Sequence, residues 1–181
     1  RFARQGGWTE EEWERAQRRN KRFYVDDYEW MRENCESCME VGATAGTSQN
    51  LKRNGRELFG VQINGVTANM QEIEDKTIGE GRFLIPQEID RAAWVCVIGD
   101  DVKEKFFDGR DAVGQTIKIS GVPLTIVGVE AKRGSFLGQS LDNHAYIPLT
   151  TFFKLFGRNR DLAIRGEANQ VETFMSTISD A

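Results

Sequence analysis

Residues 94–99 read WVCVIG and contain an unbroken run of five apolar side chains, which Gly99 and Asp100 close. Five residues is an ordinary strand length, and a continuous rather than alternating apolar run is typical of a strand buried on both faces of a sheet. The run therefore predicts a central strand. Within it, Cys96 is expected to act as a small buried apolar side chain.

Helix and strand signals alternate irregularly on both sides of this strand. Asn54-Gly55 is a two-residue turn signal and predicts a hairpin between residues 38–47 and 57–66. Short helices are expected at 67–75, from Pro86, at 101–107 and at 150–156, and further strands at 115–120, 123–129, 145–148 and 161–165. This mixture predicts an α+β fold with several hairpins.

Both ends of the chain show helical patterns. Thr9 and Glu12 fit a capping box for a charged helix that reaches about Phe23, and a second helix is expected from Asp26 to about Asn34. Near the other end, apolar residues recur on one helical face at Val171, Phe174, Met175 and Ile178. The sequence has no initial Met and stops inside this last pattern, so we expect a piece of a longer protein.

Composition excludes several classes of function. The 181 residues carry 24 Lys and Arg against 28 Asp and Glu, a net charge of −4, which provides no basic surface for nucleic acid. Hydrophobic residues make up 39%, enough for a packed core, yet no apolar run approaches the ~20 residues that span a bilayer. There is no P-loop, GxGxxG, HExxH or EF-hand motif. We therefore predict no catalytic residues, no cofactor and no metal site.

The single histidine, His144, follows Ser140 and Asp142 in a predicted turn. A Ser/His/Asp triad is assembled through the fold and is not marked by neighbouring positions in the sequence. We therefore favour a structural loop histidine that precedes a strand.

The stretch Cys35-Glu36-Ser37-Cys38 is a lone CxxC with several interpretations. A zinc site would need two further ligands, which Cys96 and His144 supply poorly. Redox activity is disfavoured because the pair follows a predicted helix, whose C-terminal end destabilises a thiolate. Cys35 and Cys38 are close enough for a structural disulfide in an oxidising compartment. The disulfide and the free thiols both remain open.

Other segments have both structural and functional interpretations. Residues 131–141 form a Gly/Ser-rich loop in which Arg133, Ser135 and Phe136 are candidate partner contacts. An exposed Phe136 would support that role, whereas a fold-back onto the core is the more ordinary outcome. The aromatic stripe at 152–156 is expected to be core. Candidate hinge positions, each equally an ordinary turn, are Gly79, Gly81, Gly157 and Gly166.

A series of short motifs, in one order along the chain, resembles a known family. They are VQINGVTA at 61–68, GEGRFL at 79–84, VCVIG at 95–99, FFDG at 106–109, DAVGQ at 111–115, the strand at 124–129, KRGSF at 132–136 and YIPLTT at 146–151. With the helix before them, they resemble the periplasmic core domain of MacB-like (FtsX-type) ABC transporter permeases over about residues 24–180. Ala112 and Gln115 replace the Pro and Lys of the family pattern, and the CESC stretch lies outside it.

The resemblance implies a fold of two lobes. A porter-like α/β lobe is built from both chain ends, 24–82 and 148–181, and a smaller α/β lobe, 83–147, is inserted into it. Residues 1–23 would form a charged helix leading from the first membrane helix, and the final helix would lead into the second. The parent would be a bacterial inner-membrane protein with this domain in the periplasm.

The resemblance also implies a non-catalytic function. The domain would transmit ATP-driven conformational change to the export of a substrate or to an envelope partner. The expected partners are the transmembrane helices and ATPase of a dimeric parent transporter, with a periplasmic adaptor or an exported peptide or lipoprotein. The alternatives are a stand-alone envelope module that binds a ligand or partner through residues 131–141, and a thiol enzyme that uses Cys35 and Cys38.

Overall fold

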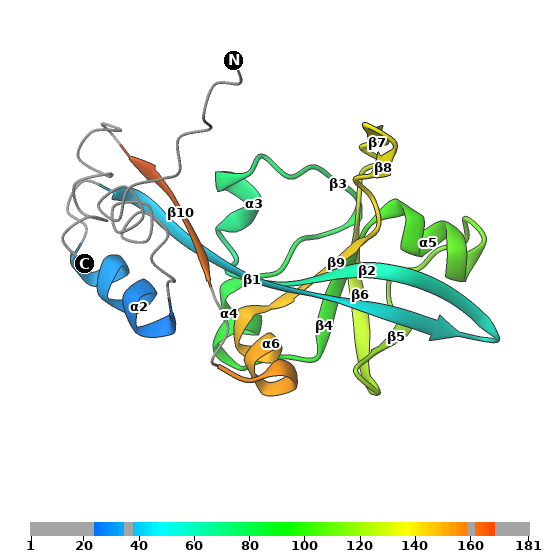
Figure 1. Ribbon diagram of the computed structural model, residues 1–181, viewed down its shortest axis with the longest axis horizontal. Helices are drawn as coiled ribbons and strands as arrows, with labels where there is room; N and C mark the ends of the chain where they lie inside the picture. Colours follow the sequence, from blue (N-terminus) through cyan, green and yellow to red (C-terminus); the bar gives the residue numbers. More distant parts are fainter. Residues whose placement is uncertain (1–23, 35–37, 159–161, 169–181) are drawn as a thin grey trace, which may run out of the picture.

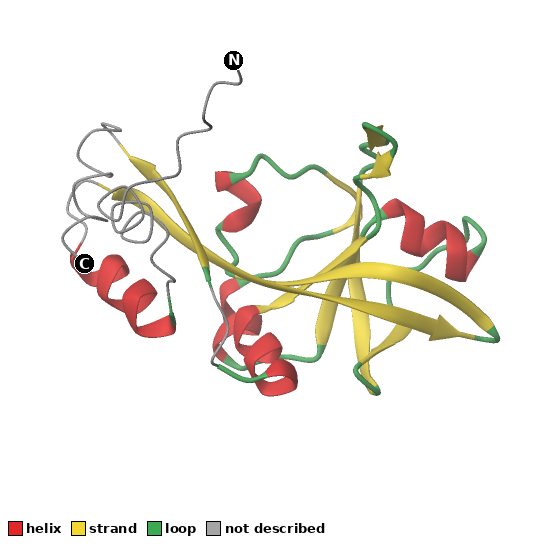
Figure 2. Cartoon of the chain, viewed as in Figure 1, coloured by secondary structure: helices red, strands yellow, loops and turns green. Residues whose placement is uncertain are grey.

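The computed structural model describes residues 24–34, 38–158 and 162–168, and these form a mixed α+β fold dominated by one sheet (Figures 1 and 2). The sheet order is β10-β1-β2-β9-β4-β6-β3, and β5 pairs with β6. The α+β prediction is confirmed. The strands are β1 (Cys38–Arg53), β2 (Arg56–Val66), β3 (Ile78–Gly81), β4 (Val95–Ile98), β5 (Thr116–Ile119), β6 (Val122–Glu130), β9 (His144–Pro148) and β10 (Ala163–Ala168).

Five helices lie in the described residues: α2 (Val25–Asn34), α3 (Met70–Ile73), α4 (Pro86–Asp90), α5 (Asp100–Phe107) and α6 (Leu149–Phe156). The predicted helices at 101–107 and 150–156 match α5 and α6 closely, whereas the helix predicted at 67–75 is limited to α3. The capping box at Thr9 and Glu12, the apolar repeat at 171–178 and Cys35 lie outside the described residues. No helix that the structure describes has the length and apolar character needed to cross a membrane.

The strands β1 and β2 form the long hairpin that runs across the molecule in Figure 1. Its turn residues Asn54 and Gly55 have φ angles of 51° and 76°, and Arg53 pairs with Arg56 across them. Two consecutive left-handed residues make the turn whose twist matches that of a hairpin, and Asn-Gly is the pair that adopts it most readily. The predicted tip is confirmed.

The central strand β4 lies between β9, to which it is antiparallel, and β6, to which it is parallel. Cys96 and Ile98 enter the larger apolar cluster on one face of the sheet, and Val97 enters a second cluster on the other. All three side chains are fully buried, which confirms the prediction from WVCVIG. Burial strongly raises the pKa of the Cys96 thiol, so the side chain remains a neutral core group.

The sheet is continuous across residues 82 and 148, where the two predicted lobes would meet. β2 pairs in parallel with β9, and β3 pairs with β6. The larger apolar cluster likewise contains Ile63 of β2 together with Ile98 of β4 and Ile126 of β6. Segments of both predicted lobes therefore share backbone hydrogen bonds and one core.

Helix α6 packs onto this core through its aromatic side chains. Phe152 is fully buried, and its ring centroid lies 6.2 Å from that of Phe153 and 4.7 Å from that of Phe156. The aromatic stripe is therefore core, as predicted. The helix approaches the sheet at Gly65, where an added Cβ would lie 2.3 Å from the Cβ of Phe152.

This close approach predicts that Gly65→Ala destabilises the fold. The new methyl group would force Phe152 and its helix away from β2, and overpacking of this kind costs about 1–3 kcal/mol. Gly46→Ala is the matched control. Gly46 pairs with Asn64, the residue before Gly65, and an added Cβ there would lie 3.1 Å from the side-chain oxygen of Asn64. Urea unfolding of both variants measures the difference, and equal stabilities would contradict the packing argument.

Candidate functional site

Residues 131–141, predicted to be an irregular loop, contain a small hairpin of two strands, β7 (Ser135–Phe136) and β8 (Gln139–Ser140). The hairpin stands apart from the main sheet, beyond the start of β9 (Figure 1). Phe136 is 66% exposed and Leu137 is 89% exposed, and Leu141 is exposed as well. Phe136 does not fold back onto the core, and the tip presents neighbouring apolar side chains to solvent.

The turn of this hairpin holds Leu137 in an unfavourable backbone conformation. Leu137 and Gly138 have φ angles of 49° and 78°, the same left-handed pair found at Asn54-Gly55. A left-handed conformation costs an L-residue with a Cβ roughly 1–2 kcal/mol, and glycine or asparagine adopts it more readily than leucine. Leu137 therefore stabilises the fold neither through its backbone conformation nor through burial of its side chain. This combination is typical of binding residues.

The base of the hairpin is held by Asp142, which is 2% exposed. Its two carboxylate oxygens accept the backbone N–H groups of Arg133 and Gly134, each at 2.8 Å. The Leu141 N–H donates to the Gly134 carbonyl at 2.9 Å, and the Asp142 N–H donates to Ser140 Oγ at 3.0 Å. Hydrogen bonds to a buried carboxylate are among the stronger ones in proteins, so the exposed tip has a rigid base.

None of these contacts joins His144 to the side chain of Ser140 or Asp142, as a catalytic triad would require. The Asp142 carboxylate binds backbone N–H groups, and Ser140 Oγ receives a backbone donor. His144 makes its closest polar contacts with Glu130 and with the Leu141 carbonyl. The prediction of a loop histidine is wrong in one respect, because His144 is the first residue of β9 and is buried.

The buried pair of His144 and Glu130 lies beneath the hairpin. His144 Nε2 is 2.6 Å from Glu130 Oε2, and neither atom has another hydrogen-bond partner. His144 Nδ1 lies 3.0 Å from the carbonyl oxygen of Leu141, which only accepts, so this nitrogen carries a hydrogen. This contact orients the imidazole so that Nε2 faces the Glu130 carboxylate.

The surroundings of Glu130 favour its ionised form. Burial alone would raise the pKa of this carboxyl, but the hydrogen bond and charge of His144, together with the charges of Lys76 and Arg133, outweigh it and hold the pKa below its ordinary value. Arg133 Nη1 lies 3.7 Å from the carboxylate. Glu130 was not singled out from the sequence, since it lies 14 positions from His144 and only the sheet brings the two together.

The lowered pKa of Glu130 predicts an acid-sensitive fold. The ionised carboxylate stabilises the native state above the ordinary glutamate pKa, and this contribution is lost as the pH falls through the lower value of the folded protein. The wild-type melting temperature should therefore fall more steeply than that of Glu130→Gln between about pH 6 and pH 3. Thermal unfolding followed by circular dichroism measures both curves. Parallel curves would show that Glu130 does not titrate differently in the folded state.

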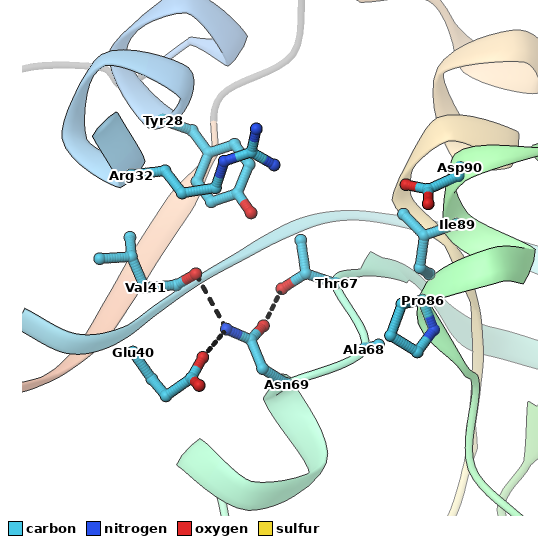
Figure 3. A pocket seen from close by; sticks show the side chains of 10 residues that line it. All are labelled: Tyr28, Arg32, Glu40, Val41, Thr67, Ala68, Asn69, Pro86, Ile89 and Asp90. Carbon is cyan, nitrogen blue, oxygen red and sulfur yellow. Dashed lines mark hydrogen bonds between the residues drawn. The ribbon is translucent and has the colours of Figure 1, made fainter.

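A separate pocket of about 330 Å³ lies between α2, β1, the β2–α3 connection and α4 (Figure 3). The Asn69 amide on its floor is fully engaged, donating to Glu40 and to the Val41 carbonyl and accepting from Thr67. Its lining includes apolar surface of Pro86 and Ile89 and charged groups of both signs, Arg32, Glu40 and Asp90. With mixed charges and a saturated floor, the pocket defines no single class of ligand.

The candidate hinge glycines occupy different settings. Gly79 and Gly81 lie in β3, where an added Cβ on Gly81 would lie 2.3 Å from the Val127 carbonyl oxygen. Gly157 ends α6 with a φ of 87°. Gly166 lies in β10 and pairs with Val41 of β1. Gly81 is thus required by close backbone approach, and Gly157 by its helix-ending conformation.

The structure describes only part of the CESC stretch. Cys35 lies outside the described residues, and only the backbone of Cys38 is described, at the start of β1. Among the described residues, no three His, Cys, Asp or Glu side chains are grouped as metal ligands. Whether Cys35 and Cys38 form a disulfide stays a prediction.

The fold has counterparts in known proteins. The profile of the MacB-like periplasmic core domain matches residues 3–180. The periplasmic region of MacB from Actinobacillus actinomycetemcomitans superposes with a TM-score of 0.76 at 15% identity, covering 90% of this chain and 74% of that one. The extracellular domain of the ABC-type transporter YknZ from Gram-positive bacteria gives 0.73 at 18% identity, covering 86% and 78%. The chain belongs to the family of MacB-like periplasmic core domains.

Relatives with curated names are much longer proteins. The pyoverdine export ATP-binding/permease protein PvdT of Pseudomonas aeruginosa is 32% identical over 120 residues, which is 65% of this chain. The macrolide export ATP-binding/permease protein MacB of Bdellovibrio bacteriovorus is 30% identical over 116 residues, which is 61% of this chain. The match covers 18% of each relative's length. The chain thus corresponds to the periplasmic domain of a MacB-type ABC transporter permease.

Proposed function

We propose that this domain is a non-catalytic part of an ABC exporter that transmits ATP-driven conformational change from the membrane to an envelope partner. The family supports the setting, since its relatives are named as ATP-binding/permease proteins for export. The proposal carries the partners expected above: the transmembrane helices and ATPase of a dimeric parent, and a periplasmic adaptor or an exported peptide or lipoprotein. A bacterial inner-membrane location for the parent belongs to the same proposal.

The observation that carries the proposal is the exposed apolar tip of the β7–β8 hairpin on its rigid base. Phe136 and Leu137 project into solvent, while Asp142 fixes the backbone at Arg133 and Gly134. A partner that covered the tip would recover the apolar burial that the isolated domain lacks. Within the candidate contact loop, Phe136 would make the apolar contact, Ser135 would lie at the rim, and Arg133 would hold the base.

In the proposed motion the two predicted lobes move as coupled parts. One lobe consists of residues 24–82 and 148–181, and the other of residues 83–147. The points of flexing are Gly79, Gly81, Gly157 and Gly166. The continuous sheet supports transmission rather than free rotation, because displacement of β2 is passed to β9 through their parallel pairing. Small displacements at the chain ends would then reach the hairpin that follows β6.

The variant Leu137→Gly distinguishes an effect on partner contact from an effect on the stability of the domain. Glycine accepts the left-handed turn conformation, so the domain should be as stable as the wild type or more stable by about 1 kcal/mol. Loss of the exposed apolar side chain should nevertheless weaken partner binding and export by the complete transporter about fivefold or more, with Phe136→Ser acting in the same direction. Thermal unfolding and substrate export by the full-length protein give the two measurements.

The matched control for this variant is Ser120→Gly in the β5–β6 turn. Ser120 and Gly121 have φ angles of 52° and 79°, so the substitution relieves the same backbone conformation at a hairpin with no proposed contact. It also removes the hydroxyl that accepts from Gln49 Nε2, so the two variants are compared by export and not by stability. Export should stay at the wild-type level in this control. Wild-type export by both Leu137→Gly and Phe136→Ser would refute the hairpin as the contact site.

A further inference from the structure

A series of contacts between charged and polar side chains, called the polar chain below, links β10 to the base of the hairpin. Arg165 of β10 contacts Glu74 through Nε, 2.7 Å from Oε1. The other oxygen of Glu74 lies 2.6 Å from Lys76 Nζ, in the connection between α3 and β3. Lys76 in turn donates to the hydroxyl of Tyr146 on β9 at 2.9 Å. These contacts join three segments that are far apart in the sequence.

Lys76 is the buried centre of this chain. Its side chain is only 4% exposed, and a lysine ammonium is tolerated at such a position only when it is paired and hydrogen bonded. The ammonium also lies 4.4 Å from the centroid of the Tyr146 ring. Burial works against its charge, but the hydrogen bonds to Glu74 and Tyr146 outweigh that effect and raise the pKa of Lys76.

From Tyr146 the polar chain continues to the hairpin. The rings of Tyr146 and His144 have centroids 4.7 Å apart, and His144 contacts both Glu130 and the Leu141 carbonyl. The charge of Lys76 also favours the ionised form of Glu130. The contacts from Lys76 onward join buried groups, whereas the Arg165–Glu74 pair at the other end lies at the surface, with the Arg165 side chain 56% exposed. An apolar side chain would fill the place of Lys76 without these directional bonds, so packing alone does not account for it.

We propose that Lys76 is a positioning residue that fixes the β7–β8 hairpin relative to β10 through Tyr146 and the His144–Glu130 pair. The hairpin is then held from two sides, by Asp142 at its own base and by this polar chain beneath it. Displacement of β10 is passed toward the contact tip through this series of ion pairs, the Lys76–Tyr146 hydrogen bond and the Tyr146–His144 ring contact. The inference rests on the hairpin being the partner-contact site of the proposed function.

Amide hydrogen exchange on the full 181-residue chain tests this link without any partner or transport. In Lys76→Met, Glu74 keeps Arg165 but loses Lys76, and the Tyr146 hydroxyl loses its donor. The amides of Arg133, Gly134 and Leu141 should then exchange about tenfold faster or more, as expected for loss of a hydrogen bond to a charged group. The amides of Arg53 and Arg56, at the far end of the β1–β2 hairpin, should exchange as in the wild type. Because no partner takes part, a failed result would remove the link and leave the contact site standing.

Lys103→Met is the matched control. Lys103 is a similarly covered lysine, 12% exposed, whose ammonium pairs with Glu80 on β3 rather than with the polar chain. Its replacement should leave exchange in the hairpin unchanged. Glu74→Gln weakens the ion pairs with Lys76 and Arg165 at a partly exposed position and leaves Lys76 in place, so it provides a milder second variant. Equal hairpin exchange in Lys76→Met and Lys103→Met, or acceleration spread evenly over the sheet, would overturn the proposal.

Discussion

Burial of β4 on both faces is the constraint on which the rest of the molecule depends. Its side chains alternate between two apolar clusters, so β6 and β9 must flank it and helices α5 and α6 must cover the larger cluster. The next residue, Gly99, connects the buried strand to the base of the β7–β8 hairpin. Its N–H donates to the His144 carbonyl, and an added Cβ would lie 2.1 Å from the Asp142 carbonyl oxygen. The end of the central strand and the base of the hairpin are therefore packed as one unit.

This packing explains why the hairpin base tolerates so many buried charges. Asp142, Glu130 and His144 are each less than a tenth exposed, and a lone charge at such depth would be costly. Each has a partner: backbone N–H groups for Asp142, and for Glu130 and His144 each other. Such pairs add little net stability compared with apolar packing, but they fix the relative orientation of the segments that they join. They are the means by which an exposed tip keeps one orientation.

The parts of the fold that follow local rules could be predicted from the sequence. Asn54-Gly55 marks its turn because that pair adopts left-handed angles readily, and WVCVIG marks a buried strand by its unbroken apolar run. The second hairpin was missed because Leu137-Gly138 adopts the same angles without the expected residue. Its turn is set by the anchored base, at Asp142, rather than by local preference.

The candidate site could be predicted only in part, for a related reason. Phe136 stood out as an aromatic residue in a polar loop, and its segment proved exposed. The pair of His144 and Glu130 could not be found, since a histidine and a glutamate on different strands meet only once the register of β6, β4 and β9 is known. The same holds for Lys76 and Tyr146, which lie 70 positions apart. Long-range polar contacts have no sequence period, so they emerge from topology alone.

The hairpin combines two features that oppose each other energetically. Its base uses buried charged groups, whose desolvation only precise partners offset, and its tip leaves Leu137 both exposed and in an unfavourable conformation. A segment that served only to connect β6 with β9 would need neither, because a polar turn with glycine or asparagine at its tip closes the same distance at lower cost. The stabilising contacts of the base and the unrecovered cost of the tip fit together when a second surface covers Phe136 and Leu137.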